Sequence, residues 1–392
     1  MQDIYNNYIL QREELLARIA HELELDKTRT ERMESAYSAV SELLSNDEDF
    51  FKKLNVEIYA QGSKRIETTV KPINGDDFDL DTVLHIYDPY FNHTPQEIFD
   101  ALVMALEKDA YYKKIMQKKS RCVRLNYKGD FHMDILPACM PNVHEKEVIK
   151  IPEKVLKNWS SGNPKGFSKW FLTIASSFEK SLLMVYADDL IKAQVETEPL
   201  PDGLYEKTPL QRAVQLMKRY RDIFFKNNTD YRVSSIVITT LAATFYQGEN
   251  SIYESIDKII SRIKNSYSLS IIQGKRFKVL NPINSDEDFT DSWTDQHYKS
   301  FYEFITDFSK KWDSLKRSFE FSKDDYILLF GEGLYKNALN EQIRFFSAKT
   351  SDPLVRSSGL ITSGAALTNS KGQINRDTGT KNEKHNNFGG TY

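Results

Sequence analysis

One stretch of the chain places acidic residues at every second position, and this strongly limits how it can fold. Residues 77–81 read DFDLD, so Asp77, Asp79 and Asp81 alternate with two apolar residues. Because successive side chains of a strand point to opposite faces, a strand here gathers the carboxylates on one face. The pattern therefore predicts a strand with one acidic face and one apolar face.

Two short motifs indicate what these acids could do. Earlier in the chain, Gln61, Gly62 and Ser63 directly follow a predicted strand at 56–60. Glycine lets a backbone approach a phosphate closely, and serine offers a hydroxyl and an N–H. Later, FHMDILP carries Asp134 between two apolar residues and ends in proline, which predicts a second acid-bearing strand. Since Mg²⁺ prefers oxygen ligands and often bridges carboxylates to substrate phosphates, the combination predicts a magnesium and triphosphate site.

The composition is that of an ordinary globular chain without a strong charge bias. It has 392 residues, 40% hydrophobic and 28% charged, with a formal net charge of −3. Duplex-binding proteins usually carry a basic excess, so an obligate DNA partner is disfavoured. Two cysteines exclude a disulfide framework and a Cys-rich zinc module, which fits a reducing cytoplasm. No signal-peptide pattern is present, and the longest apolar-leaning run, 235–246, is too short to span a membrane, so we expect a cytoplasmic protein.

Hydrophobic periodicity divides the chain into three parts. Helical spacing over 3–45 precedes the predicted strands, and helical periods dominate again beyond about residue 160. The end of the chain is rich in Gly, Ser, Asn, Thr and Lys and lacks a hydrophobic period, which is typical of a flexible tail. We therefore predict a core at 1–160 that includes the N-terminal helix, a helical domain at 161–349 and a tail at 350–392.

The motifs GSKRIETT, DFDLDTVL and FHMDILPA resemble those of the DNA polymerase β-like nucleotidyltransferase superfamily. The later segments NPKGFSKWF, LQRAVQLMKRYRD, SSIVITTLAA and NPINSDEDF resemble the bacterial cGAS/DncV-like nucleotidyltransferases (CD-NTases) of CBASS anti-phage systems. The resemblance implies an α/β (α+β) fold, with a polymerase β-like core and mixed twisted sheet plus a helical C-terminal domain. It also implies that the active site lies in the cleft between them.

The resemblance assigns the catalytic and metal-binding roles to particular acids. Asp77 and Asp79 match the paired metal ligands, and Asp134 matches the third acid. Asp79 and Asp81 also form an alternating pair, but the family places an apolar residue after the second acid. We therefore prefer Asp77 and Asp79, with Asp81 as a neighbouring acid. The implied cofactor is a pair of Mg²⁺ ions, with Mn²⁺ as the alternative.

Further residues are assigned to the nucleotide. The motif at 61–63 matches the nucleotide-binding Gly-Ser motif, and Lys218 matches a triphosphate-binding lysine. Ser235 begins the segment that contacts the donor nucleotide in relatives, and Arg124 is a candidate phosphate contact on a predicted strand. From the residues alone, a solvated helix lysine stays the alternative for Lys218, and a helix N-cap the alternative for Ser235.

Together these assignments predict an enzyme that condenses nucleoside triphosphates, ATP among them, with release of pyrophosphate. The residues themselves justify nucleotidyl transfer, and the resemblance implies a cyclic di- or trinucleotide second messenger for anti-phage defence. Three alternatives stay open: a nucleotidyltransferase that modifies RNA ends or proteins, a catalytically silent binding module, and a toxin-like partner of a second protein.

The C-terminal sequence HNNFGGTY suggests a protein partner. It resembles tails that a ubiquitin-transfer-like enzyme of CBASS systems conjugates through a terminal glycine, so we expect a regulatory protein of this or another CBASS type at the tail. A disordered end without a partner stays the alternative. Here Thr391 and Tyr392 follow Gly390, which departs from that pattern. We expect no membrane partner.

Overall fold

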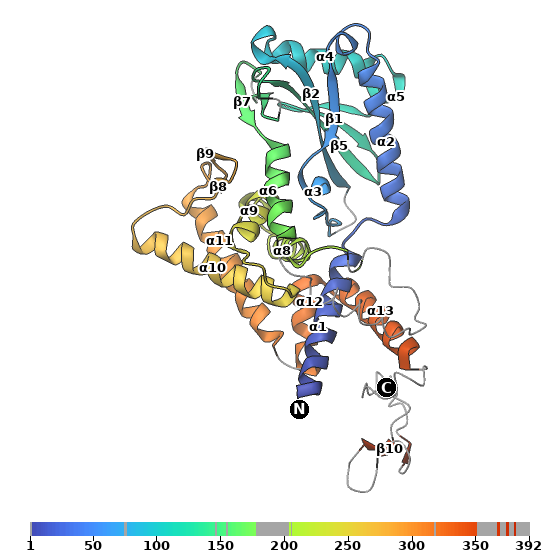
Figure 1. Cartoon of the computed structure of the whole chain (residues 1–392), viewed down its shortest axis with the longest axis vertical. Helices are drawn as coiled ribbons and strands as arrows, with labels where there is room; N and C mark the ends of the chain where they lie inside the picture. Colours follow the sequence, from blue (N-terminus) through green and yellow to red (C-terminus); the bar gives the residue numbers. More distant parts are fainter. Residues whose placement is uncertain are drawn as a thin grey trace.

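The computed structural model describes residues 2–73, 77–145, 147–153, 156–177, 204, 206–316 and 319–350, with three short strands after them. These residues form a lobe built on a β-sheet and a lobe built of helices (Figure 1). The helix α6 (Pro164–Ser176) leads from the sheet lobe into the helical lobe. This arrangement confirms the predicted α/β class with a helical C-terminal region.

In the described chain a mixed sheet of seven strands forms the first lobe. The strands are β1 (Val56–Ala60), β2 (Phe78–Pro89), β3 (Met116–Lys118), β4 (Val123–Tyr127), β5 (Phe131–Met140), β6 (Ile149–Pro152) and β7 (Trp159–Gly162). The main order is β1-β2-β5-β4-β3, and β6 and β7 extend from β5. Strands β2 and β5 run parallel, so the two acid-bearing strands are direct neighbours.

The two faces of the sheet have different surroundings. Leu80 and Leu84 of β2 share a buried cluster with Leu102 of α4 (Pro95–Glu107) and with residues of α2 (Lys27–Ser45). Because strand side chains alternate, Asp79 and Asp81 point to the opposite face. None of the helices in this cluster covers that face, and α6 approaches the sheet from that side. The apolar half of the DFDLD pattern thus fixes the direction in which the acids point.

Several helices begin where the sequence supplies a cap. The side chain of Asp26 accepts a hydrogen bond from the backbone of α2. Capping boxes start α4, through Thr94 and Glu97, and α8 (Pro209–Phe224), through Thr208 and Gln211. Such side chains satisfy backbone N–H groups that have no partner within the helix. The sheet lobe also contains shorter helices: η1 (Phe51–Lys53), α3 (Gly62–Arg65), η2 (Tyr90–Asn92) and α5 (Ala110–Ile115).

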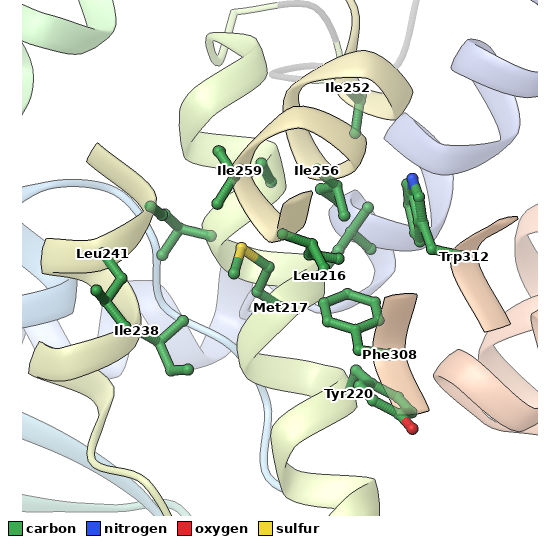
Figure 2. Close-up of a cluster of buried hydrophobic side chains, with 14 of the residues drawn as sticks. Leu216, Met217, Tyr220, Ile238, Leu241, Ile252, Ile256, Ile259, Phe308 and Trp312 are labelled. Atoms are coloured by element: carbon green, nitrogen blue, oxygen red, sulfur yellow. The ribbon is translucent and has the colours of Figure 1, made fainter. Parts of the chain in front are cut away.

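The second lobe consists of helices around a large apolar cluster. Its elements are α1 (Gln2–Glu22), α8, η3 (Thr229–Tyr231), α9 (Ser235–Phe245), α10 (Ile252–Ile272), the hairpin β8 (Leu280–Asn281) and β9 (Asn284–Asp288), α11 (Asp295–Ser314), α12 (Phe319–Phe330) and α13 (Glu332–Thr350). Figure 2 shows Met217 and Tyr220 of α8 among side chains of α9, α10 and α11. None of the described helices is both long and apolar enough to cross a bilayer.

The N-terminal residues form two helices that pack in different lobes. Leu16 of α1 lies in the cluster of the helical lobe, whereas Leu44 of α2 lies in the cluster of the sheet lobe. The buried carboxylate of Glu13 also accepts hydrogen bonds from the first two backbone N–H groups of α10, at 2.6 and 2.9 Å. A core at 1–160 stays a prediction, and in the structure α1 packs with the helices that follow residue 200.

The predicted tail at 350–392 lies almost entirely outside the described residues. Its described parts are β10 (Leu367–Thr368), β11 (Ile374–Asn375) and β12 (Thr380–Lys381), which pair antiparallel.

Candidate active site

The parallel pairing of β2 and β5 brings acidic residues together. Asp81 is the direct partner of Asp134, and Asp79 is the partner of His132. Paired residues of neighbouring strands point to the same face, so the three carboxylates share one side of the sheet. Burial, followed by the negative charges of Asp134 and Asp79, raises the pKa of Asp81 to about 6. A bound cation would relieve this repulsion.

The Gly-Ser turn lies directly against these carboxylates. The backbone N–H of Gln61 donates to the carbonyl of Asp81 at 2.9 Å. Gly62 has a φ of 61°, and a Cβ at this position would lie 3.1 Å from a carboxylate oxygen of Asp81. Both the backbone conformation and the close approach require glycine here. Ser63 follows on the first turn of α3 and lines a cleft together with these carboxylates.

Asp77, a predicted metal ligand, lines the same cavity as Asp79 and Asp81 but lies outside β2. It precedes the first residue of β2, and its Oδ2 lies 3.7 Å from Nε2 of His132. Asp81, by contrast, faces Asp134 across the strand pair and adjoins the Gly-Ser turn. The geometry therefore favours the alternative pair Asp79 and Asp81 over the preferred pair Asp77 and Asp79. The choice between these two pairs depends on the register of strand pairing, which is not local in the sequence.

A cleft of about 930 Å³ separates the sheet lobe from the helical lobe. Ser63, Asp79 and Asp81 line its sheet wall, and Lys218 and Ser235 line its helical wall. Candidate residues that lie far apart in the sequence thus line one cleft. A cleft of this size at a domain boundary is a common setting for nucleotide sites.

Lys218 is buried in α8 and already has hydrogen-bond partners. Its Nζ donates to the carbonyl and the hydroxyl of Thr68, at 3.1 and 2.9 Å. Thr68 in turn donates its backbone N–H to Ser63, so Lys218 connects α8 to the segment that carries the Gly-Ser motif. Burial and then the positive charge of Arg221 lower the pKa of Lys218 to about 7. A solvated helix lysine is therefore not what the structure shows.

The helical wall carries further cations that the sequence analysis did not select. Arg221 lies one turn after Lys218 in α8, and Arg232 precedes α9; both line the cleft. The guanidinium of Arg221 donates to the hydroxyl of Ser235 at 2.7 Å. Ser235 is not the N-cap of α9, since that position belongs to Ser234. Arg221 lies within the segment LQRAVQLMKRYRD that carried the resemblance, so its position three residues after the predicted lysine was the available signal.

Arg124, which the sequence predicts to contact a phosphate, lies against the acidic residues of the sheet wall. It is the cross-strand partner of Asp134 on β4. Its Nε and Nη2 donate to the two carboxylate oxygens of Asp134, each at 2.7 Å, and Nη2 lies 3.4 Å from Oδ1 of Asp79. These contacts hold the third acid in a bidentate ion pair.

The chemistry of the donor set fits a divalent cation. Asp79, Asp81 and Asp134 offer carboxylate oxygens on one face, and hard divalent ions take oxygen ligands. As the side chains stand, no group of three or more His, Cys, Asp or Glu residues in the described chain encloses a metal position. Both oxygens of Asp134 are engaged by Arg124, so a cation there would have to share this carboxylate with the guanidinium.

Comparison with known proteins identifies a relative that matches nearly the whole chain. Residues 11–174 match the family model described as Second Messenger Oligonucleotide or Dinucleotide Synthetase domain (SMODS). A c-di-GMP synthase from Roseivirga ehrenbergii is 39% identical over 93% of this chain and 95% of its own length. The cyclic dinucleotide synthase CdnG from Bradyrhizobium diazoefficiens is 28% identical over 60% of this chain and 59% of its own.

Solved structures share the fold at lower identity. The CD-NTase CdnG of Bradyrhizobium diazoefficiens in complex with GTP matches with a TM-score of 0.67 and 20% identity, over 84% of this chain and 98% of that chain. A complex of CdnC with HORMA-deltaN from E. coli MS115-1 matches with a TM-score of 0.58 and 13% identity, over 82% and 97%. These matches establish a common two-lobed architecture.

Proposed function

The chain belongs to the SMODS family of cyclic oligonucleotide synthases, the CD-NTases, and we propose that it converts two molecules of GTP into c-di-GMP. The family confirms the predicted enzyme class, a nucleotidyltransferase, and the predicted kind of product, a cyclic oligonucleotide. It disfavours a silent binding module and an enzyme that modifies RNA ends. Guanine is proposed because the relative called a c-di-GMP synthase matches nearly the whole chain.

The observation that carries the proposal is the opposition of charge across one cleft. Carboxylates gather on the sheet wall beside Gly62, and Lys218, Arg221 and Arg232 lie on the helical wall. A nucleoside triphosphate bound with divalent cations is complementary to both walls, because its cations face the acids and its phosphates face the basic side chains. Neither wall alone requires such a ligand.

In the proposed reaction Asp79, Asp81 and Asp134 hold divalent cations, magnesium in preference to manganese. Bound there, the cations would supply Lewis-acid chemistry that lowers the pKa of the acceptor hydroxyl and stabilises the pyrophosphate that leaves. The Gly62 backbone permits close approach of the triphosphate, and Lys218 and neighbouring cations balance its charge. The acceptor oxygen bonds to the donor α-phosphorus as the bond to pyrophosphate breaks, and a second transfer closes the ring.

The β8–β9 hairpin supplies a candidate for base selection. Glu287 and Asn281 line the cleft, and Nδ2 of Asn281 donates to Oε2 of Glu287 at 2.7 Å. Guanine presents two N–H donors on its Watson–Crick edge, and a carboxylate can accept both. We therefore propose that Glu287 reads guanine and that Asn281 orients its carboxylate.

A regulatory protein completes the proposal. The CdnC–HORMA complex shows that one protein with this fold assembles with another protein. The C-terminal residues, including Gly390, are the proposed contact for a ubiquitin-transfer-like or other CBASS partner. They lie outside the described residues, so this part of the proposal rests on the sequence.

The test is mass spectrometry of the products that the purified chain forms from ATP, GTP, CTP and UTP with magnesium. We expect c-di-GMP and pyrophosphate from the wild type and neither from Asp79→Asn. Glu287→Gln should still release pyrophosphate but incorporate other bases. A cyclic product without guanine would contradict the proposed substrate. Transfer to RNA or protein with no cyclic product would contradict the proposed reaction.

A further inference from the structure

Arg124 is held between the two proposed metal ligands that flank it. Its guanidinium makes two bonds of 2.7 Å to Asp134 and one contact of 3.4 Å to Asp79. The side chains of Arg124 and Asp134 are 24% and 18% exposed, whereas that of Asp79 is 60% exposed. The Asp134 pair is thus the sheltered part of the cluster.

This pair is built into the sheet. Arg124 and Asp134 are direct cross-strand partners in the antiparallel ladder of β4 and β5, so the backbone keeps them opposed. Bidentate arginine–carboxylate pairs are among the stronger ionic interactions, and partial burial reduces their screening by salt. The guanidinium therefore stays beside the carboxylate whenever nothing stronger binds it.

A divalent cation needs the same atoms. Metal–oxygen distances are about 2.0–2.6 Å, and a cation that binds the Asp134 carboxylate draws electron density from the oxygens that accept from Arg124, so the two interactions weaken each other. The guanidinium also adds a positive charge next to the cation position. A free cation thus meets both a competitor and a repulsive charge. A cation delivered with a triphosphate brings extra ligands and neutralising charge.

We propose that Arg124 is a positioning residue that competes with free divalent cations for Asp134 and so makes metal binding depend on the arrival of the nucleotide. The inference deepens the proposed function and rests on its metal site. It differs from a direct phosphate contact, which would change the affinity for nucleotide and leave nucleotide-free metal binding unchanged. It also differs from a merely structural role, because loss of a structural support would weaken metal binding.

The test measures Mn²⁺ binding to the full chain, without nucleotide, from the electron paramagnetic resonance signal of free Mn²⁺. We expect Arg124→Gln to bind Mn²⁺ about fivefold to tenfold more tightly than the wild type, and Arg124→Lys to fall between them. A non-hydrolysable GTP analogue should narrow the difference. The charge control is Arg32→Gln, which removes an exposed cation that pairs with Asp130 on the β4–β5 turn and should change the Kd by less than about twofold.

A second readout guards against misfolded variants. The rise in Tm on adding Mn²⁺ should be larger for Arg124→Gln than for the wild type, and both should show cooperative unfolding. Equal or weaker Mn²⁺ binding by folded Arg124→Gln, with wild-type binding intact, would overturn the inference. If Asp81→Asn bound Mn²⁺ as well as the wild type, the proposed metal site would fail, and the inference would fail with it.

Discussion

The two walls of the cleft bury opposite charges. On the sheet wall, burial and like charges raise the pKa of Asp81 to about 6. On the helical wall, burial and a like charge lower the pKa of Lys218 to about 7. Both shifts disfavour the charged form, and an isolated protein gains nothing from either. Each wall therefore has the properties of half a binding site, and a ligand that carries both charges would relieve both.

The walls differ in how their charges are held. Asp81 and Asp134 are opposed by backbone pairing between two strands, so their separation is fixed by the sheet. Lys218 and Arg221 reach the cleft through long side chains, Lys218 hydrogen-bonded to Thr68 and Arg221 to Ser235 and Asp222. A substitution on the sheet wall removes an element that no neighbour replaces. One on the helical wall leaves other cations close by, so we expect graded effects there.

The largest effect should separate Asp81 from Asp77. Asp81→Asn removes one charge from the face that adjoins Gly62, and we expect c-di-GMP synthesis to fall at least about a hundredfold. Asp77→Asn, the same change four residues earlier and outside β2, removes a contact to His132 and should lower the rate less than about fivefold. Initial rates of pyrophosphate release measure both. If the two variants lost equal activity, or if Asp77→Asn lost more, the pair Asp77 and Asp79 preferred from the sequence would be favoured again.

The next effect should appear at Lys218 and differ in sign between activity and stability. Lys218→Met should lower kcat/KM for GTP about tenfold to a hundredfold, because a cation opposite the acids is lost. It should leave the free energy of unfolding unchanged or raise it, because a buried ammonium group no longer has to be desolvated. Exposed Lys226, changed to Met, is the control for both measurements. A Lys218→Met variant that unfolds easily and keeps its kcat/KM would assign this lysine to structure.

The sheet wall should also make stability depend on pH. The folded-state pKa of Asp81 is raised from 3.8 to about 6, so the folded chain binds this proton more tightly than the unfolded chain. Its contribution to the free energy of unfolding is therefore lost as the pH rises from about 4 to about 6, and amounts to roughly 2–3 kcal/mol. In the presence of a chelator, Asp81→Asn should exceed the wild type in stability at pH 7.5 and approach it at pH 4. If the free energy of unfolding of the two proteins had the same pH dependence, the pKa of Asp81 would not be raised in the folded chain.

Local patterns in the sequence predicted most of the architecture. Alternation at 77–81 and the FHMDILP motif gave two acid-bearing strands, and the structure makes them neighbours in a mixed sheet. Helical periods after residue 160 gave the second lobe. These features depend on residues close in sequence, such as the apolar residues that alternate with Asp79 and Asp81. The sequence of a single chain is therefore enough to show them.

What the sequence could not give depends on contacts between distant residues. The choice between Asp77 and Asp81 depends on the register with β5, and the position of Arg124 depends on its pairing with Asp134 across β4 and β5. Helix α1 joins the helical lobe through contacts such as those from Glu13 to the start of α10, more than two hundred residues later. No periodicity in either segment encodes such a pairing.

The smallest effect should test how the helical wall is organised. The hydroxyl of Ser235 accepts a hydrogen bond from Arg221, so Ser235→Ala removes one of the contacts that place that guanidinium, while its ion pair with Asp222 stays. Loss of one such bond is worth about 1 kcal/mol, which corresponds to a rise in the KM for GTP of about threefold to fivefold with little change in kcat. Steady-state kinetics measure both constants, and Ser268→Ala, an exposed serine of α10 that does not line the cleft, is the matched control.

The decisive form of this experiment is a double-mutant cycle with Arg221→Gln. If Ser235 acts by placing Arg221, then Ser235→Ala should have almost no further effect once the arginine is gone. If the serine instead contacts the nucleotide directly, as its place in the resemblance implied, its effect should persist unchanged in the Arg221→Gln background. Additive effects would therefore mean that the helical wall binds GTP through independent groups. A strong coupling would mean that α8 and the start of α9 act as one unit against the fixed acids of the sheet.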